Sequence, residues 1–334
     1  MWKLFVLTLL GAATLAAQRI EINWPAPHPG FAQGRPPAEY LQHAGSGDPE
    51  SGNFGGVRSG GGQFHEGIDI VPTKRDRRGE ATDPVFAVLD GVVRHVSQMA
   101  GKSSYGRYVV LEHPGVEPAI YTLYAHLATI DVGIRPGMQV RRGQTLGVMG
   151  RSAGGYVIPR ERAHLHFEMG LMVTRDFQAW YDWRKFGSSN EHGLYNGMNL
   201  MGFNPLDFYQ KHRARAVDNF LDYFAQMEPV VKFRIATHRR PDFVDRYPEL
   251  VHKDRPMLVG GWEVWCDWTG LPFHWRALTP AEVRGMKPNE VRLIEVDEAE
   301  ERRQRSKQLA VRRAGGWAPG RDLQTLLQQL FGLR

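Results

Sequence analysis

Five residues that can bind a metal ion or move a proton fall in three short segments of the chain. The first segment is His65-Glu66-Gly67-Ile68-Asp69, the second contains His126, and the third is His164-Leu165-His166. Imidazole and carboxylate groups are zinc ligands, and imidazoles left over can transfer protons. A catalytic zinc site needs three protein ligands and a fourth position open to water. The three segments therefore hold the groups that a zinc hydrolase requires.

The spacing of these residues predicts a local structure for each segment. Residues two apart in a strand point to one face, so His164 and His166 should lie side by side. Gly67 and the β-branched Ile68 oppose a helix over 65–69, which favours a turn that leads into a strand. Taken singly, each pair is explained as well by packing or by a hydrogen bond. Their occurrence together in one β-rich stretch favours a shared site.

Two neighbouring side chains could orient the histidines. His126 follows an alternating run, and this alternation places Tyr124 on the same face as His126, where it could orient a ring or pack. Glu168 has the spacing to share a face with His166. It could orient that imidazole, although a salt bridge at the end of the strand is the favoured interpretation.

Short strands separated by turns surround these segments and predict a mainly β fold with an antiparallel, β-rich domain over residues 51–208. Residues 171–203 interrupt this pattern as a packed excursion or as a wall beside a groove, and we favour the packed excursion. Two strand pairs are expected, 84–89 with 92–96 around Asp90-Gly91, and 108–111 with 120–124.

Beyond Phe208 the composition changes, and residues 209–334 predict a mixed α+β C-terminal region without recognisable chemistry. Thr279-Pro280-Ala281-Glu282 has the form of a capping box at the start of a helix. Asp322 is a plausible helix cap. Helices are expected over 209–227, 297–314 and 322–331, and strands across 230–278.

Composition limits the class of protein. The chain has 334 residues, of which 42% are apolar, so it can form two domains with a sizeable core. Its formal net charge is +6, but no block of Lys and Arg is long enough for a nucleic-acid-binding arm, so no nucleic-acid partner is expected. Cys266 is the single cysteine, which excludes an internal disulfide. It should be a buried structural thiol on a strand face with Trp262 and Val264.

The first residues predict export. Residues 1–17 combine the basic Lys3, the apolar run 4–10 and the small residues of 12–17, which is the pattern of a secretory signal peptide. Residues 18–50 read as an irregular N-terminal arm. We therefore expect an exported, periplasmic or extracellular protein with no integral membrane span in its mature chain, and the oligomeric state stays open.

The segments together resemble the lysostaphin-type, LytM-like zinc metallopeptidases, which cut peptide bonds in peptidoglycan. The resemblance covers residues 51–208. The stretches that carry it are Asn53-Phe54-Gly55-Gly56-Val57-Arg58, His65-x-Gly67-Ile68-Asp69-Ile70, Asp83-Pro84-Val85-Phe86-Ala87, Asp90-Gly91-Val92-Val93, Leu123-Tyr124-Ala125-His126-Leu127 and His164-Leu165-His166-Phe167-Glu168.

This resemblance implies an antiparallel β-sheet peptidase core with a groove, of the LytM or duplicated-hybrid-motif type. It implies one zinc ion (Zn²⁺) per chain, bound by His65, Asp69 and His166. His126 and His164 would be the catalytic pair that flanks the metal-bound water. We favour His164 as the base because it neighbours a ligand, but the residues leave the division of roles open.

Two departures from the family pattern bear on specificity. Residues 156–162 are inserted before the last motif, and the excursion after Glu168 is long. The sequence is compatible with three functions. The first is an exported, cell-wall-associated zinc metalloendopeptidase that hydrolyses peptide bonds in peptidoglycan stems or cross-bridges. The alternatives are a non-enzymatic cell-wall-binding or amidase-activating module, whose representatives typically lack metal ligands, and a metallopeptidase with a protein substrate. The roles of 209–334 and of the N-terminal arm, which could cover the site, stay open.

Overall fold

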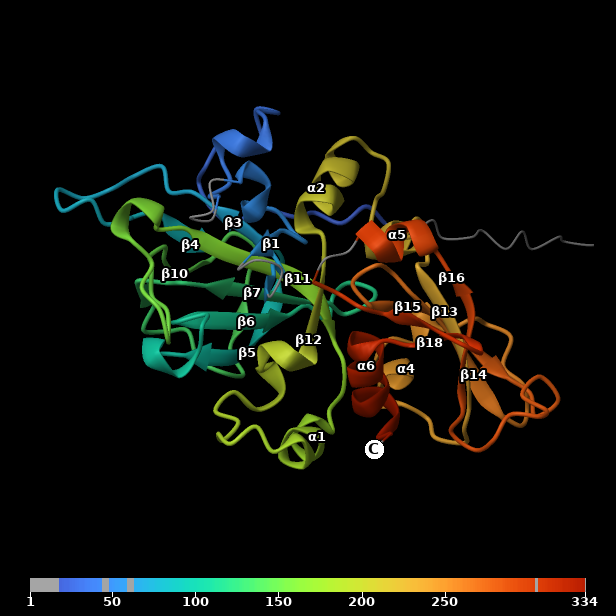
Figure 1. The fold of residues 1–334 in the computed structure, drawn as a ribbon. Coiled ribbons are helices and arrows are strands. Elements are labelled where there is room, and N and C mark those ends of the chain that lie inside the picture. The colour runs from blue at the N-terminus through green and yellow to red at the C-terminus, as the bar shows by residue number, and fades with distance from the viewer. Residues whose placement is uncertain (1–17, 44–47, 59–62, 304–305, 334) are drawn as a thin grey trace, which may run out of the picture.

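The computed structural model of the protein describes residues 18–43, 48–58, 63–303 and 306–333 (Figure 1). The expected signal segment, 1–17, lies outside the described residues. Within the described ranges, every helix is too short or too polar to cross a lipid bilayer.

A large antiparallel sheet underlies the three histidine-bearing segments. Its strands are β3 (Ile68–Ile70), β5 (Gly91–Ser97), β6 (Tyr108–Glu112), β7 (Tyr121–Ala125), β9 (Gln139–Val140), β11 (Leu165–Met172) and β12 (Leu200–Phe203). Their order is β12-β11-β7-β6-β5-β9, and β3 pairs with β11 beside this path (Figure 1). The pairing of β6 with β7 confirms the expected strand pair over 108–111 and 120–124. Strand β11 is buried along its whole length, because both of its faces are covered.

The hairpin expected around Asp90-Gly91 is wrong. Strand β4 (Pro84–Phe86) pairs with β10 (Thr145–Val148), which in turn pairs with β8 (Thr129–Ile130) in a second sheet. Strand β5 pairs instead with β6 and β9. Residues 87–89 between β4 and β5 are buried, so the chain passes from one sheet to the other through the core rather than turning back at the surface. A short β1 (Val57–Arg58) and β2 (Gln63–Phe64) pair beside the large sheet.

The C-terminal region is a second, mixed α+β layer, as the sequence predicts. Its sheet has the order β15-β14-β13-β16 (Figure 1), built from β13 (Val231–Ala236), β14 (Gly261–Cys266), β15 (Pro272–Leu278) and β16 (Val291–Val296). Cys266 is fully buried on β14, as expected of a structural thiol. A further hairpin joins β17 (Ala310–Arg313) to β18 (Gly316–Pro319).

The helices of the structure only partly follow the sequence pattern. The expected 322–331 helix is α6, but its N-cap is Gly320, and Asp322 instead accepts a hydrogen bond from the backbone of Gln308. Thr279 and Glu282 form the reciprocal bonds of a capping box, yet the chain stays in turns there. The expected long helices are shorter: 209–227 is broken into α2 and α3, and among the described residues of 297–314 the helix is α5 alone. The bounds are α1 (Phe177–Arg184), α2 (Pro205–Arg213), α3 (Phe220–Ala225), α4 (Asp242–Arg246), α5 (Glu298–Arg303) and α6 (Arg321–Phe331).

Single-turn 3-10 helices lie in the connecting segments. They are η1 (Pro37–Glu39), η2 (Pro49–Gly52), η4 (Ala100–Lys102), η5 (Arg160–Arg162), η6 (Gly193–Tyr195), η7 (Gly197–Asn199) and η8 (Pro248–Leu250).

One hydrophobic core runs through both parts of the chain. The ring of Phe208 on α2 stacks on Phe220 of α3 with 4.5 Å between centroids, and Phe203 of β12 lies 5.9 Å from Phe220. Trp268, beyond β14, lies edge-on to Phe54 at 5.7 Å, close to the first histidine segment. The C-terminal region is therefore packed against the large sheet rather than attached to it by a linker.

Truncation of Phe208 tests this shared core. The Phe208→Ala variant should lose about 3–5 kcal/mol of unfolding free energy, because its fully buried ring contacts both parts of the chain. Val132→Ala, at a fully exposed turn, is the control and should change stability by less than about 0.5 kcal/mol. Urea unfolding followed by tryptophan fluorescence measures both. A variant that unfolds its C-terminal region first while the large sheet keeps its original midpoint would contradict a shared core.

Candidate metal centre

The register of two strands brings the first and third segments together. Asp69 in β3 is the direct cross-strand partner of His166 in β11. Directly opposed residues of an antiparallel pair place their side chains on one face, with Cβ atoms about 4.5–5.5 Å apart. His65 lies in the turn that enters β3, as predicted, so its ring reaches the same face. The site is thus fixed by backbone pairing.

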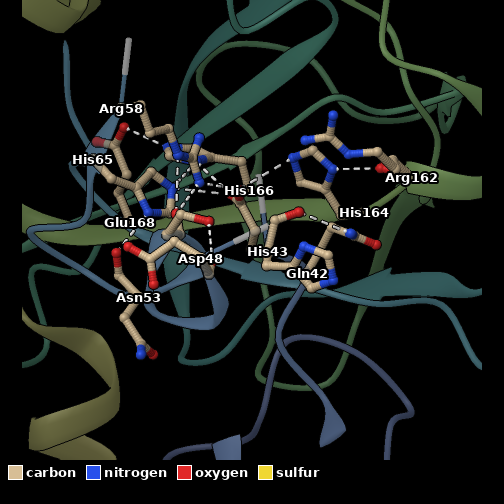
Figure 2. Close-up of polar contacts among 12 residues, drawn as sticks. Gln42, His43, Asp48, Asn53, Arg58, His65, Arg162, His164, His166 and Glu168 are labelled. Atoms are coloured by element: carbon tan, nitrogen blue, oxygen red, sulfur yellow. Dashed lines mark hydrogen bonds and ion pairs between the residues drawn. The ribbon is translucent and has the colours of Figure 1, made fainter. Parts of the chain in front are cut away.

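Three donor atoms converge on this face (Figure 2). His65 Nε2 lies 3.0 Å from Asp69 Oδ1 and 3.1 Å from His166 Nδ1, and His166 Nδ1 lies 3.0 Å from the same Asp69 oxygen. Tetrahedral zinc with bonds of about 2.0–2.2 Å separates its ligand atoms by about 3.3–3.6 Å. All three side chains are buried, with at most 4% of their surface exposed. The structure therefore brings together the three residues that the resemblance implies as ligands.

Hydrogen bonds on the far side of each ring define which nitrogen is free. His65 Nδ1 donates to the Asn53 carbonyl oxygen at 2.7 Å, and His166 Nε2 donates to Glu168 Oε1 at 3.0 Å. Since each of those nitrogens carries the ring proton, the nitrogens that face Asp69 bear lone pairs. Three lone-pair atoms at this spacing repel one another unless a positive charge lies between them. This donor set fits a divalent zinc ion.

Burial and neighbouring groups shift the pKa values of His166 and Asp69 in opposite directions. Burial lowers the pKa of His166, but hydrogen bonds to the carboxylates of Asp69 and Glu168 outweigh it and raise that pKa to about 10. Burial opposes ionisation of Asp69, yet the charges of His164 and His65 and the hydrogen bond from His166 hold its pKa well below the usual range.

His65 Nε2, Asp69 Oδ1 and His166 Nδ1 form a triangle of possible metal-binding atoms, here called the donor triangle. Arg58 contacts the aspartate from outside this triangle. Its Nη2 donates to Asp69 Oδ2 at 2.6 Å, and its Nε donates to the Ser51 carbonyl oxygen at 2.9 Å. The guanidinium thereby occupies the second carboxylate oxygen and leaves Oδ1 directed at the two histidines. The sequence motif over residues 53–58 includes Arg58 but does not predict this contact.

The prediction of a strand-end salt bridge for Glu168 is wrong. Its side chain is 1% exposed inside β11, and its carboxylate accepts from His166 Nε2, from the Tyr105 hydroxyl at 2.6 Å and from the Tyr121 hydroxyl at 2.9 Å. Three donors satisfy the buried carboxylate, which fixes the tautomer and the angle of the His166 ring. No sequence signal identified Tyr105 and Tyr121, because they come from a loop and another strand.

His126 reaches the site through an irregular backbone. Strand β7 ends at Ala125, which pairs with His166, and a regular continuation would place His126 on the opposite face, with Tyr124. Instead, His126 has a φ of 60°, a left-handed conformation that costs a residue with a side chain about 1–3 kcal/mol. The expectation that Tyr124 shares its face is therefore wrong: Tyr124 packs on Phe167, with 5.3 Å between ring centroids.

The two remaining histidines lie beside the triangle. The His126 ring centroid lies 4.8 Å from that of His164 and 5.8 Å from that of His166. His126 Nδ1 donates to the Ser152 carbonyl and His164 Nδ1 to the Arg162 carbonyl, both at 2.8 Å, so each ring keeps an unprotonated Nε2. Figure 2 shows the contact of His164 with Arg162. Burial is the largest cause that lowers the pKa of both rings. Both are thus neutral bases at pH 7.

A cavity of about 640 Å³ opens beside this cluster. His65, His126 and His166 line it, whereas His164 does not, and its Nε2 lies 3.5 Å from Asp69 Oδ2. The excursion after β11 packs against the domain and also lines the cavity. Its helix α1 buries Phe177 and Trp180 in a small apolar cluster, and several residues between Trp180 and Met201 form part of the cavity wall. The C-terminal region also lines the cavity, through Thr269, Lys307 and α6.

Comparison with known proteins places part of this chain in a family. Residues 63–175 match the family described as Peptidase family M23. They include the two strands and the loops that carry the donor triangle and both remaining histidines. No curated protein matches the chain.

Several solved structures are similar over limited stretches. A zinc-containing peptidase from Vibrio cholerae is 31% identical over 32% of this chain and 26% of that chain, with a TM-score of 0.24. A putative glycyl-glycine endopeptidase LytM from Ruminococcus gnavus is 29% identical over 32% of this chain and 39% of that one, with a TM-score of 0.27. The catalytic domain of lysostaphin from Staphylococcus simulans is 18% identical over 52% and 93%, with a TM-score of 0.31.

The chain thus spans less than half the length of the first two of these structures. The TM-scores are low, so the similarity is limited to part of the chain. The match to the family and the antiparallel fold support peptidase activity for the matched stretch. This part of the chain, residues 63–175, is a LytM-like peptidase domain of family M23.

Proposed function

We propose that the protein is an exported zinc metalloendopeptidase that hydrolyses peptide bonds in peptidoglycan stems or cross-bridges. The observation that carries this proposal is the convergence of His65 Nε2, Asp69 Oδ1 and His166 Nδ1 within 3.1 Å of one another, beside two further histidines and a cavity. The family match of residues 63–175 supports the peptidase class.

His65, Asp69 and His166 would hold the zinc ion. When bound in such a site, zinc lowers the pKa of a water molecule to about 7 and polarises a carbonyl group. Glu168 and the Asn53 carbonyl keep the two ligand rings in the required tautomers, and Arg58 holds the second aspartate oxygen. The side chains are thereby preorganised before substrate arrives.

We assign proton acceptance to His126. Its Nε2 is unprotonated, and its ring lines the cavity in which a substrate carbonyl would lie. His164 was favoured from adjacency to His166 alone, but its Nε2 faces the Asp69 carboxylate at 3.5 Å. His164, which faces the Asp69 carboxylate and does not line the cavity, would instead help to position that ligand, and His126 would return its proton to the leaving amine.

The non-enzymatic wall-binding or amidase-activating role is not favoured, since members with that role typically lack metal ligands. Here all five histidine and aspartate side chains lie together in a buried cluster. The same chemistry would also cleave a peptide bond in a protein substrate. Wall fragments and glycine-rich peptides offered to the same preparation distinguish the two substrates.

Substitution of a ligand and substitution of a base should have different effects. His166→Ala should lower zinc affinity by more than about 100-fold and abolish hydrolysis, because it removes a donor. His126→Gln should keep one zinc per chain while kcat falls by about 10²–10⁴-fold. Zinc content by atomic emission and new amino termini released from peptidoglycan measure the two effects. A His126→Gln enzyme of unchanged activity would refute its role, and undiminished activity after chelation of zinc would refute the mechanism.

Replacement of Glu168 tests its hold on His166. Glu168→Gln should weaken zinc binding by about 10- to 100-fold, because a carboxamide can turn its NH₂ towards the ring and no longer fixes the tautomer. Glu112→Gln, at a partly exposed salt bridge with Arg94, is the matched control and should leave zinc affinity unchanged. Competition with a fluorescent zinc chelator measures both. Equal affinities for wild type and Glu168→Gln would show that Glu168 serves packing alone.

A further inference from the structure

The cavity beside the histidine cluster has an unequal charge on its walls. Four Lys or Arg residues line it, against two acidic residues. The acids are Glu66 and Asp322, and the cations are Arg58, Lys102, Arg184 and Lys307.

Most of these charges are already compensated within the protein. Arg58 binds Asp69, and Lys102 Nζ lies 3.0 Å from Glu191. Lys307 interacts with the charge of Glu66, and its Nζ lies 4.5 Å from the centre of the Phe64 ring. Asp322 accepts from Arg321 at 3.1 Å.

Arg184 differs from the other cations. Among the described residues it forms no ion pair, and it lies at the C-terminal end of α1. Its guanidinium carbon lies 5.8 Å from the centre of the Trp180 ring and 5.6 Å from that of Phe186, and its Nη1 donates to Gln328 Oε1 at 3.5 Å. Two aromatic rings and one amide hold the group at the junction of α1 and α6, with donors left for a ligand.

Apolar side chains accompany this cation. Large hydrophobic residues are seldom exposed, yet Tyr156, Phe186 and Met198 are 41–50% exposed, and all three line this cavity. Tyr156 comes from the insertion before the last motif, and the other two come from the excursion. The two departures from the family pattern therefore supply the apolar part of the wall.

We infer that this cavity selects peptides that carry a free carboxylate, with Arg184 as the specificity-determining residue that binds it. The inference rests on the proposed function, since it concerns the substrate of the same site. α6 and the excursion form a fixed wall: Gln329 Nε2 donates to the Met198 carbonyl at 2.8 Å, and Trp180 Nε1 donates to Gln328 Oε1 at 3.3 Å. The C-terminal region thus contributes to substrate selection by holding Arg184 in place.

Equilibrium binding to zinc-loaded protein tests the inference independently of cleavage. The probes are a peptidoglycan stem pentapeptide with its carboxylates free and the same peptide with every carboxylate converted to a carboxamide. Calorimetric titration should show about 10-fold tighter binding of the free form, since one charge-assisted pair contributes about 1.4 kcal/mol. Arg184→Gln should reduce the preference to less than about 2-fold, and Arg184→Lys should retain part of it, because the charge remains but the planar fork is lost.

Two control variants remove a cation without removing the proposed contact. Lys102→Met removes a cation of the cavity that is already paired, and Arg284→Gln removes an exposed one that does not line the cavity. Both should keep the preference. Equal binding of the two peptides by wild type, or a preference that survives in folded Arg184→Gln, would overturn the inference.

Cleavage of cross-linked wall peptides, measured separately, distinguishes the two proposals. Binding that depends on the carboxylate and on Arg184, without any cleavage, would leave this inference standing and refute the peptidase proposal. Cleavage with no carboxylate preference would do the reverse.

Discussion

The pairing of β3 with β11 is the constraint on which the site depends. Because Asp69 and His166 are direct cross-strand partners, the hydrogen bonds of the sheet fix their side chains on one face. A slip of one residue in this register would turn His166 to the other face and dissolve the donor triangle. Burial of Ile68 and Ile70 on β3, and of Leu165 and Phe167 on β11, makes such a slip costly. Burial of these apolar side chains thus fixes the strand register that places Asp69 and His166 together.

Around the donor triangle, hydrogen bonds determine which nitrogen of each histidine ring faces the site. Each of the four histidine rings donates one N–H to an oxygen, which leaves its other nitrogen as the one that can bind a metal ion or accept a proton. In the proposed mechanism, His65 and His166 would be metal ligands through that nitrogen, and His126 would accept a proton on it. The same ring type therefore has two roles, decided by which nitrogen the surroundings engage.

The sequence predicted much of this arrangement, and the failures have physical causes. Alternation and turn residues identified β6, β7 and the C-terminal sheet, because those strands follow local rules. The Asp90-Gly91 hairpin failed because residues 87–89 are buried between two sheets, which a local pattern does not reveal. The face of His126 was mispredicted because its backbone leaves the strand with a positive φ. Five site residues could be named from their motifs, whereas Tyr105 and Tyr121 could not, since their contact with Glu168 depends on tertiary packing.

The C-terminal region lies next to the candidate metal centre, which its composition did not suggest. Its helix α6 and the excursion line the cavity beside the histidine cluster, and a continuous core joins the C-terminal region to the large sheet. The proposed substrate recognition and the proposed catalysis would therefore both depend on one continuous core.

Anomalous X-ray scattering from a crystal of the zinc-loaded protein, recorded on both sides of the zinc absorption edge, tests the central claim most directly. The account predicts one strong peak per chain within about 2.0–2.2 Å of His65 Nε2, Asp69 Oδ1 and His166 Nδ1. A zinc peak elsewhere in the chain, or none at these three atoms in a protein that cleaves its substrate, would contradict it.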